Sequence, residues 1–446
     1  MPSVNSAEEK TPLTHRAILS IALPVMLSNI STPLIGVVDT GVVGQLPDPA
    51  YIGAVAVGSL IFSFVFWAFG FLRMGTTGFT AQALGARDNS EIAASLGRAL
   101  LIAFTVGIVL IALQWPVREA AFVLLEGSER VETLARSYFD IRIWAAPATL
   151  VNYALLGWFI GLGRTDIGLV LQLVLNLTNM ALDALFVLGF GWDVRGVAFG
   201  TLISEWGAAL IGLIIAIRYL RKFNVRWSRK NLLILQRLKR TIAVNSDIMI
   251  RSLALIFVFV WFMAQGAKQG NVILAANAVL MHLISVSAYF LDGLAFAAEG
   301  FVGRAIGSGH RAGLTAAAKM TTLWAGGVAL FLSGTIILFG TAFIDLLTID
   351  EAVRNAARTY LPWAIGAPLL GVWAFQLDGI FIGATRSAEM RNAMLASFLV
   401  YMAAWWVLTP LANHGLWAAL YVNYVARIGT LYYHYPALVR SVPVGM

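Results

Sequence analysis

Residues 155–164 read LLGWFIGLGR, and residues 377–386, which lie 222 positions later, read LDGIFIGATR. Six of the aligned positions are identical, namely Leu, Gly, Phe, Ile, Gly and Arg. The same offset places residues 78–85, GFTAQALG, on residues 300–307, GFVGRAIG. Self-similarity at one fixed offset indicates an internal repeat. The sequence therefore predicts a chain made of two structurally equivalent halves.

Composition excludes most classes of soluble protein. The chain has 446 residues, of which 59% are hydrophobic and 12% charged, whereas soluble proteins average about 45–50% apolar and about 25% charged residues. The mean hydropathy is +0.80. In a soluble protein the net charge of +8 would suggest nucleic acid as a partner, but here the basic residues fall between apolar runs. We therefore predict a membrane protein in contact with lipids, with no nucleic-acid partner.

Several chemistries lack the residues that they need. The absence of Cys excludes disulfides, thiolate metal sites and cysteine nucleophiles. The sequence contains no HExxH, GxxxxGK[ST] or GxSxG motif. We therefore expect no enzyme activity, no metal and no cofactor, and we expect an ion gradient rather than bound ATP to supply energy.

Twelve apolar runs are long enough to cross a bilayer, which takes about 20 helical residues. They cover residues 17–44, 51–84, 92–114, 133–163, 167–190, 196–219, 241–267, 272–306, 314–344, 357–384, 389–412 and 415–437. The repeat offset places each run of the first half on a run of the second. Because each half has an even number of spans, both copies share one orientation. We predict an all-α polytopic fold of twelve transmembrane helices in two parallel six-helix repeats, with a transport pathway between the two lobes.

The predicted domains are an N-terminal six-helix lobe (1–218), a basic cytoplasmic linker (219–240) and a C-terminal six-helix lobe (241–446). On the side of the membrane that carries both termini lie 20 of the 31 Lys and Arg residues. The positive-inside rule places that side in the cytoplasm. The basic run at 218–240 is best explained as a cytoplasmic anchor, the alternative being a site for anionic headgroups or an acidic partner. Residues 1–16 are polar, so we expect no cleaved signal peptide.

Polar residues of the first lobe form the main candidate site, because intramembrane acids are costly and usually functional. Helix direction and rise place them at one level near the outer face; they are Asp39, Asn152, Asn179, Asp183, Thr201 and Glu205. Asn179 and Asp183 are four residues apart and share a helix face. The repeat offset replaces Asp39 by Trp261 and Asp183 by Trp405, so the acidic cluster belongs to one lobe. This asymmetry indicates cation or proton handling; hydrogen bonding within the bundle is the structural alternative.

Charged residues of the second lobe are expected deeper in the membrane. Asp292 lies near the middle of its span, and Arg251 can pair with Asp378 or with Asp292. Such a buried ion pair can fix helix register or close a gate. We favour a structural pair over a coupling site.

Two prolines make the first helix the one most able to bend. Pro24 and Pro33 each remove a backbone hydrogen-bond donor from the helix interior. We expect bending at these positions to accompany transport.

The sequence resembles the multidrug and toxic compound extrusion (MATE) family. The resemblance rests on the twelve helices in two repeats and on ALPVMLSNISTPLIGVVDTGVVG at 22–44. Four further stretches are similar to the bacterial DinF branch: FLRMGTTGFTAQALGA at 71–86, NSDIMIRSLAL at 245–255, YFLDGLAFAAE at 289–299 and LDGIFIGATRSAEMRN at 377–392. The resemblance covers nearly the whole chain and implies a V-shaped, alternating-access transporter in the inner membrane of a bacterium.

The resemblance also implies which residues couple ion movement to export. Relatives use an aspartate on helix 1, an Asn-x-x-x-Asp pair on helix 5 and a threonine on helix 6, which match Asp39, Asn179 with Asp183, and Thr201. The helix 1 tyrosine of some relatives is Ile35 here. Another branch uses a glutamate on helix 7 and an aspartate on helix 10; Asp378 matches the latter, but helix 7 offers no clear glutamate. The departure favours coupling through the first lobe.

Together these features lead to one leading hypothesis and two alternatives. The leading one is a monomeric antiporter that exports amphipathic or cationic compounds in exchange for H⁺, with Na⁺ as the alternative ion. Asp39 and Asp183 share protons, and Asp39 also contacts the cationic substrate. A flippase for a lipid-linked precursor is the first alternative, and it would need a cationic cavity for a pyrophosphate. A purely structural membrane protein is the second, and it would not need buried carboxylates.

Overall fold

The twelve predicted spans are all helical. A computed structural model describes residues 13–124, 128–222 and 234–443, and within these ranges it contains helices and no strand. Eleven helical segments are long and apolar enough to cross a membrane, and the last of them, Ser387–Arg440, holds two helices joined by a short 3₁₀ turn. The predicted all-α fold is therefore confirmed.

Each lobe supplies six crossings, some built from two consecutive helices. The first lobe comprises α1 (His15–Val43), α2 (Ala50–Ala68) with α3 (Phe71–Gly85), α4 (Asn89–Ala112), α6 (Glu129–Arg142) with η2 (Ile143–Ala145) and α7 (Ala146–Gly161), α8 (Thr165–Ala184) with the π turn η3 (Leu185–Gly189), and α9 (Val194–Lys222). A short helix, α5 (Gln114–Leu124), separates α4 from α6. The second lobe comprises α11 (Leu235–Lys268), α12 (Asn271–Gly307), α13 (Arg311–Leu347), α14 (Glu351–Gly383), α15 (Ser387–Leu408) with η4 (Thr409–Leu411), and α16 (Ala412–Arg440).

Helix ends follow local chemistry. The side chains of Thr14, Asp88, Ser128 and Asp350 accept hydrogen bonds from backbone N–H groups in the first turns of α1, α4, α6 and α14. These bonds satisfy donors that have no partner inside a helix.

Helices extend into the predicted linker at 219–240: α9 continues to Lys222, and α11 begins at Leu235. The rest of that linker, with its basic residues Arg226, Arg229 and Lys230, lies outside the described residues.

Two pairs of residues with positive φ are related by the repeat offset. Arg87 and Gly309 have φ of 56° and 68°, and they lie 222 residues apart. Gly163 and Thr385, with φ of 74° and 53°, are separated by the same offset. A left-handed residue just beyond a helix ends it and turns the chain. The two halves therefore terminate equivalent helices by the same device.

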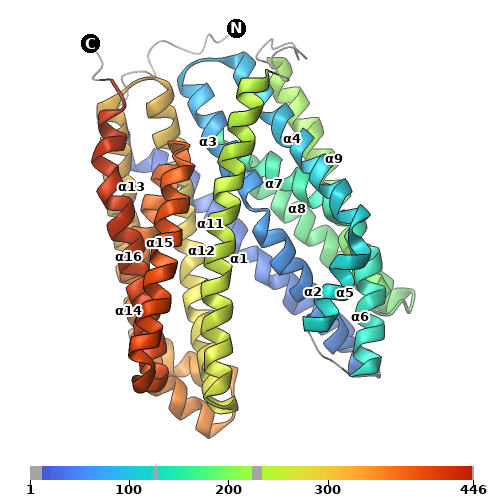
Figure 1. Cartoon of the computed structure of the whole chain (residues 1–446). Coiled ribbons are helices and arrows are strands. Elements are labelled where there is room, and N and C mark those ends of the chain that lie inside the picture. The colour runs from blue at the N-terminus through green and yellow to red at the C-terminus, as the bar shows by residue number, and fades with distance from the viewer. Residues whose placement is uncertain (1–12, 125–127, 223–233, 444–446) are drawn as a thin grey trace.

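The two lobes form a V (Figure 1). Helix α1 begins and α16 ends at the same end of the molecule, which we call the terminal end. The ribbons of the lobes lie close together there and diverge toward the opposite, far end. The main inter-lobe contacts are made by α3 with α12 and by α1 with α12.

Helices α3 and α12 cross at glycines that are related by the repeat. A Cβ on Gly85 would lie 2.1 Å from the carbonyl oxygen of Arg304, and one on Gly307 would lie 2.0 Å from that of Gln82. Gly85 and Gly307 are equivalent in the two halves. Small residues let helix backbones approach this closely within a membrane. The crossing is therefore a symmetric seam that holds the lobes together at the terminal end.

A buried ion pair extends this seam. Arg73 of α3 donates from Nη1 to Glu299 Oε2 of α12 at 3.0 Å, and its guanidinium lies 3.7 Å from the centre of the Phe296 ring. Both Arg73 and Glu299 are buried. Because breaking a buried pair leaves charges unpartnered, this contact favours the closed arrangement of the terminal end.

We expect Gly85→Ala to loosen the seam, because its new Cβ would collide with the Arg304 carbonyl oxygen. Overpacking of this kind costs about 1–3 kcal/mol. Since the chain contains no cysteine, Thr77→Cys, a buried position on α3, provides a single reporter. The Thr77→Cys protein that also carries Gly85→Ala should react with a maleimide roughly tenfold faster than the Thr77→Cys protein without it.

Gly326→Ala on α13 is the matched control, because a Cβ there meets nothing within 4 Å. It should leave the labelling rate unchanged. Equal rates for the Gly85 and Gly326 variants would contradict the role assigned to the glycine crossing.

Candidate functional site: a buried carboxyl pair in the first lobe

The structure brings Asp39 and Asp183 together. Asp39 lies near the far end of α1 and is 6% exposed, while Asp183 lies near the end of α8 and is fully buried. The two carboxyl groups interact directly, side chain to side chain. Oδ1 of Asp39 and both carboxylate oxygens of Asp183 are buried without a hydrogen-bond donor among the described residues. Two ionised carboxylates can only accept hydrogen bonds, so the described residues leave these oxygens without a donor.

A glycine and a π turn make room for this pair. A Cβ on Gly200 of α9 would lie 1.9 Å from Asp183 Oδ1, so only glycine accommodates the carboxylate there. Immediately after α8, residues 185–189 form the π turn η3. Single π turns inside helices frequently occur at functional sites. The local backbone is therefore adapted to a buried acid at position 183.

The amide and hydroxyl residues predicted beside the pair form two small networks. Asn179, one turn before Asp183, donates from Nδ2 to Thr201 Oγ1 at 3.3 Å and so ties α8 to α9. Asn152 of α7 donates from Nδ2 to Oε2 of Glu205 at 2.7 Å and to its backbone carbonyl at 3.1 Å. Asn179 also interacts with the Asp183 carboxyl group, so the Asn179–Thr201 link adjoins the Asp39–Asp183 pair, and Asn152 with Glu205 forms a separate pair.

Sequence reasoning missed one cation beside these acids. Arg142, the last residue of α6, interacts electrostatically with the carboxyl groups of Asp39, Asp183 and Glu205. Its Nη1 donates to the hydroxyl oxygen of Tyr138 at 2.5 Å. The available signal was an arginine inside an apolar span, which marks a functional position by default.

The second lobe contains the predicted ion pair and an additional arginine. Arg251 and Arg427 both donate from Nη2 to Oδ2 of Asp378, and all three residues are buried. Of the two partners expected for Arg251, the structure thus selects Asp378. Asp292 interacts electrostatically with Arg251, Arg427 and the inter-lobe Arg73. With Glu299 included, Arg73, Arg251 and Arg427 lie near three acids, the other two being Asp292 and Asp378. The buried charges of this cluster therefore balance.

Helix α1 connects the two lobes and contains both predicted bending positions. Pro24 and Pro33 lie inside a continuous helix. Between them, Asn29 donates from Nδ2 to the carbonyl oxygen of Tyr289 on α12 at 3.2 Å. The part of α1 before Pro33 thus contacts the second lobe as well as α8, to which Ser31 is bonded through Asn176, whereas Asp39, after Pro33, meets Asp183 in the first lobe.

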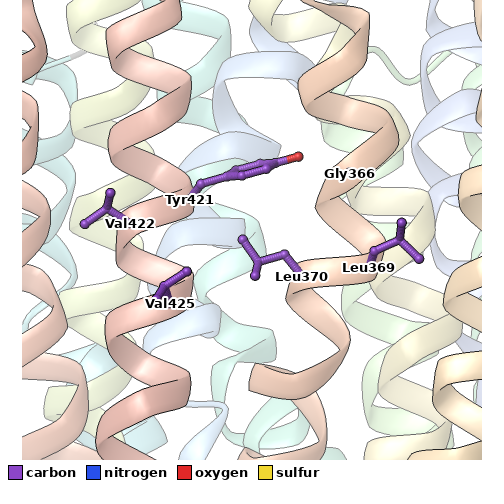
Figure 2. Close-up of a pocket in the computed structure, with 6 residues that line it drawn as sticks. All are labelled: Gly366, Leu369, Leu370, Tyr421, Val422 and Val425. Atoms are coloured by element: carbon purple, nitrogen blue, oxygen red, sulfur yellow. The ribbon is translucent and has the colours of Figure 1, made fainter.

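A separate hollow lies between α14 and α16 (Figure 2). Its lining is almost entirely apolar and consists of Gly366, Leu369, Leu370, Tyr421, Val422 and Val425. The Tyr421 hydroxyl points across it toward α14 and donates to the carbonyl oxygen of Trp363. Without a charged lining residue, this hollow offers no binding site for a proton or a cation.

Over the described ranges, no cluster of three or more His, Cys, Asp or Glu residues could hold a metal ion.

Comparison with known proteins reveals the family. The MatE family model matches the chain twice, over residues 24–185 and 248–407. The chain belongs to the MatE family. It is 40% identical to the DNA damage-inducible protein F of Escherichia coli (strain K12) over 93% of this chain and 90% of the relative. The predicted resemblance to MATE transporters and to the DinF branch is therefore confirmed.

One more distant relative of this MatE chain is a multidrug export protein. The chain is 20% identical to the multidrug export protein MepA of Staphylococcus aureus (strain NCTC 8325 / PS 47), over 95% of this chain and 94% of that relative. A solved structure described as the outward-facing conformation of a multidrug resistance MATE family transporter of the MOP superfamily has a TM-score of 0.86 and 17% sequence identity to this chain. It covers 95% of this chain and 96% of that one. The MatE chain therefore has the two-lobe MATE fold and belongs to a family of multidrug efflux transporters.

We expect Gly200→Ala to impair transport by the MatE chain more than it impairs folding. The new Cβ would displace the Asp183 carboxylate from its place beside Asp39, at a cost of about 1–3 kcal/mol. Substrate-driven transport in proteoliposomes should fall about tenfold or more, while thermal unfolding in detergent shifts by only a few degrees.

Gly207→Ala on the same helix is the matched control, because a Cβ there has nothing within 4 Å. It should transport at the wild-type rate. Undiminished transport by the Gly200 variant would show that the position of Asp183 does not matter.

Proposed function

We propose that the chain is a secondary antiporter that exports amphipathic and cationic compounds in exchange for H⁺, with Na⁺ as the alternative ion. The observation that carries this proposal is the buried Asp39–Asp183 pair and its carboxylate oxygens without donors. An isolated buried charge is costly, so the pair has a strong demand for a positive partner. A proton or a cationic substrate can meet that demand, and the two therefore compete.

Competition at one acidic pair is sufficient for exchange. When the pair is ionised, a cationic substrate finds an attractive, water-poor site. When a proton enters, the negative charge falls and the substrate is released. Because substrate and proton occupy the site alternately, their movements are coupled, and alternating access of the two lobes converts this coupling into export.

The proposed setting is the inner membrane of a bacterium, with both termini in the cytoplasm and the far end of the V facing outward. The distribution of Lys and Arg supports this orientation. The divergence of the lobes at the far end (Figure 1) suits a state that is open to the outside. The two MatE matches within one chain support a monomer, since both halves of the pathway come from the same polypeptide.

The flippase alternative receives less support. A pyrophosphate headgroup needs a cavity with net positive charge. The buried arginines Arg73, Arg251 and Arg427 instead face Glu299, Asp292 and Asp378, which leaves no surplus charge in that cluster.

We expect Asp39→Asn and Asp183→Asn each to abolish substrate-driven proton flux, because neither variant retains two carboxyl groups to share a proton. The measurement uses proteoliposomes with an imposed pH gradient, without sodium, challenged with tetraphenylphosphonium. Asp166→Asn is the control on α8, because that side chain is 59% exposed and pairs with Arg164; it should retain flux.

Wild-type flux that appears only after sodium is added would replace H⁺ by Na⁺ as the coupling ion. Full flux in either variant would overturn coupling through the pair. Failure of the wild type in both conditions, together with competition by a lipid-linked headgroup, would favour the flippase.

We expect Pro33→Ala to reduce transport without lowering the amount of folded protein. The alanine restores a backbone donor and straightens α1 between its contact with α12 and its acid pair. Pro436→Ala, at an exposed position near the end of α16, serves as the control. Transport and membrane yield are measured side by side, and normal transport by the Pro33 variant would remove bending there from the mechanism.

A further inference from the structure

Arg142 occupies an unusual position in the first lobe. It ends α6 at the break before η2. Besides its bond to the Tyr138 hydroxyl, Nη1 donates to Ser59 Oγ of α2 at 3.4 Å, and the guanidinium carbon lies 4.9 Å from the centre of the Phe62 ring. Two neutral hydroxyl groups and an aromatic face therefore hold a permanent cation in place.

The acids near Arg142 are not bound to it directly. Arg142 interacts electrostatically with Asp39 of α1, Asp183 of α8 and Glu205 of α9. Within the described part of the chain, no ion pair of 4.0 Å or less joins Arg142 to any of them. Its Nε is buried and has no hydrogen-bond partner there. The cation is thus beside the acidic site rather than in it.

The charge balance shows what Arg142 changes. Asp39, Asp183 and Glu205 carry a charge of −3 when all three are ionised and −2 when one proton lies on the aspartate pair, and Arg142 makes either total one unit less negative. The other titratable groups facing this region are Tyr138 of α6 and Tyr153 of α7, the latter also influenced by Arg73; both tyrosines are neutral near pH 7. Arg142 is therefore the fixed charge that weakens the attraction of the acidic site for every mobile cation.

We propose that Arg142 is the built-in counter-cation of the first-lobe site, a specificity-determining residue that sets how tightly the Asp39–Asp183 pair holds cationic substrates and protons. This inference rests on the proposed function. Its bond to Tyr138 keeps the guanidinium away from the carboxylates, so the site stays open to a substrate cation. Its positive potential keeps binding weak enough for release.

The test compares Arg142→Gln with Arg142→Lys in tetraphenylphosphonium binding to the purified full-length protein. One unit charge several ångströms away changes cation affinity by about tenfold at intermediate dielectric constant. At pH 8 the Gln variant should bind the cation about tenfold more tightly than wild type, whereas the Lys variant should resemble wild type. The pH midpoint of binding should rise by about one unit in the Gln variant, because the more negative site also holds protons more strongly.

A second variant removes the hydrogen bond between Arg142 and Tyr138 and should change the tetraphenylphosphonium affinity in the opposite direction. Tyr138→Phe removes the hydroxyl that accepts the Arg142 bond and keeps the aromatic ring. The freed guanidinium can then approach the carboxylates, so tetraphenylphosphonium should bind more weakly than in wild type. Arg118→Gln, whose side chain pairs with Asp140, is the control for loss of an arginine elsewhere in this lobe and should leave affinity unchanged.

The outcomes separate this inference from the proposed function. Suppose that Asp39→Asn abolishes exchange, while Arg142→Gln binds with wild-type affinity and midpoint: the role of Arg142 is then wrong and the antiporter stands. If Asp39→Asn leaves exchange intact, the proposed function itself fails. If Arg142→Gln does not fold, unchanged affinity in folded Tyr138→Phe would still overturn the tethered counter-cation.

Discussion

The close crossing of α3 and α12 is the constraint on which the rest of the structure depends. Gly85 and Gly307 allow each backbone to contact a carbonyl oxygen of the other helix, and no larger residue fits without separating the lobes. Because the crossing lies at the terminal end, the lobes can diverge only toward the far end, which produces the V. The same crossing brings Arg73 against Glu299, so a charged contact reinforces a purely steric one.

Charge is arranged differently in the two lobes, although their helices are equivalent. The second lobe neutralises its buried arginines locally, with Arg251 and Arg427 on a single carboxylate oxygen of Asp378. The first lobe retains surplus acid, and its nearest arginine binds to neutral hydroxyl groups instead. A duplicated scaffold thus contains one lobe whose buried charges are paired with each other and one lobe with buried carboxylate oxygens that lack a partner among the described residues.

Much of this fold could be predicted from sequence, because the signals are strong in the membrane. Long apolar runs define the spans, and the 222-residue offset defines the repeat. The helical spacing of Asn179 and Asp183, together with the expected depth of Asp39, identified residues that the structure brings together. Pairing between distant helices was harder: nothing in the local pattern links Arg73 to Glu299 or Arg427 to Asp378. The environment of Arg142 was also hidden, since it depends on Ser59 from another span and on a break between α6 and α7.

Helix α1 belongs to both lobes at once. Its first half packs on α12, where a Cβ on Gly293 would meet Met26 Cγ at 2.5 Å, and its second half ends beside Asp183. At a rise of about 1.5 Å per residue, Asp39 lies roughly 20 Å along the axis from Met26. The helix therefore packs on both lobes, and a tilt of about 5° about Met26 would displace the Asp39 carboxylate by nearly 2 Å, on the order of the small helix shifts that switch other proteins. A change in how α1 packs on α12 would therefore also change the separation of the Asp39 and Asp183 carboxyl groups.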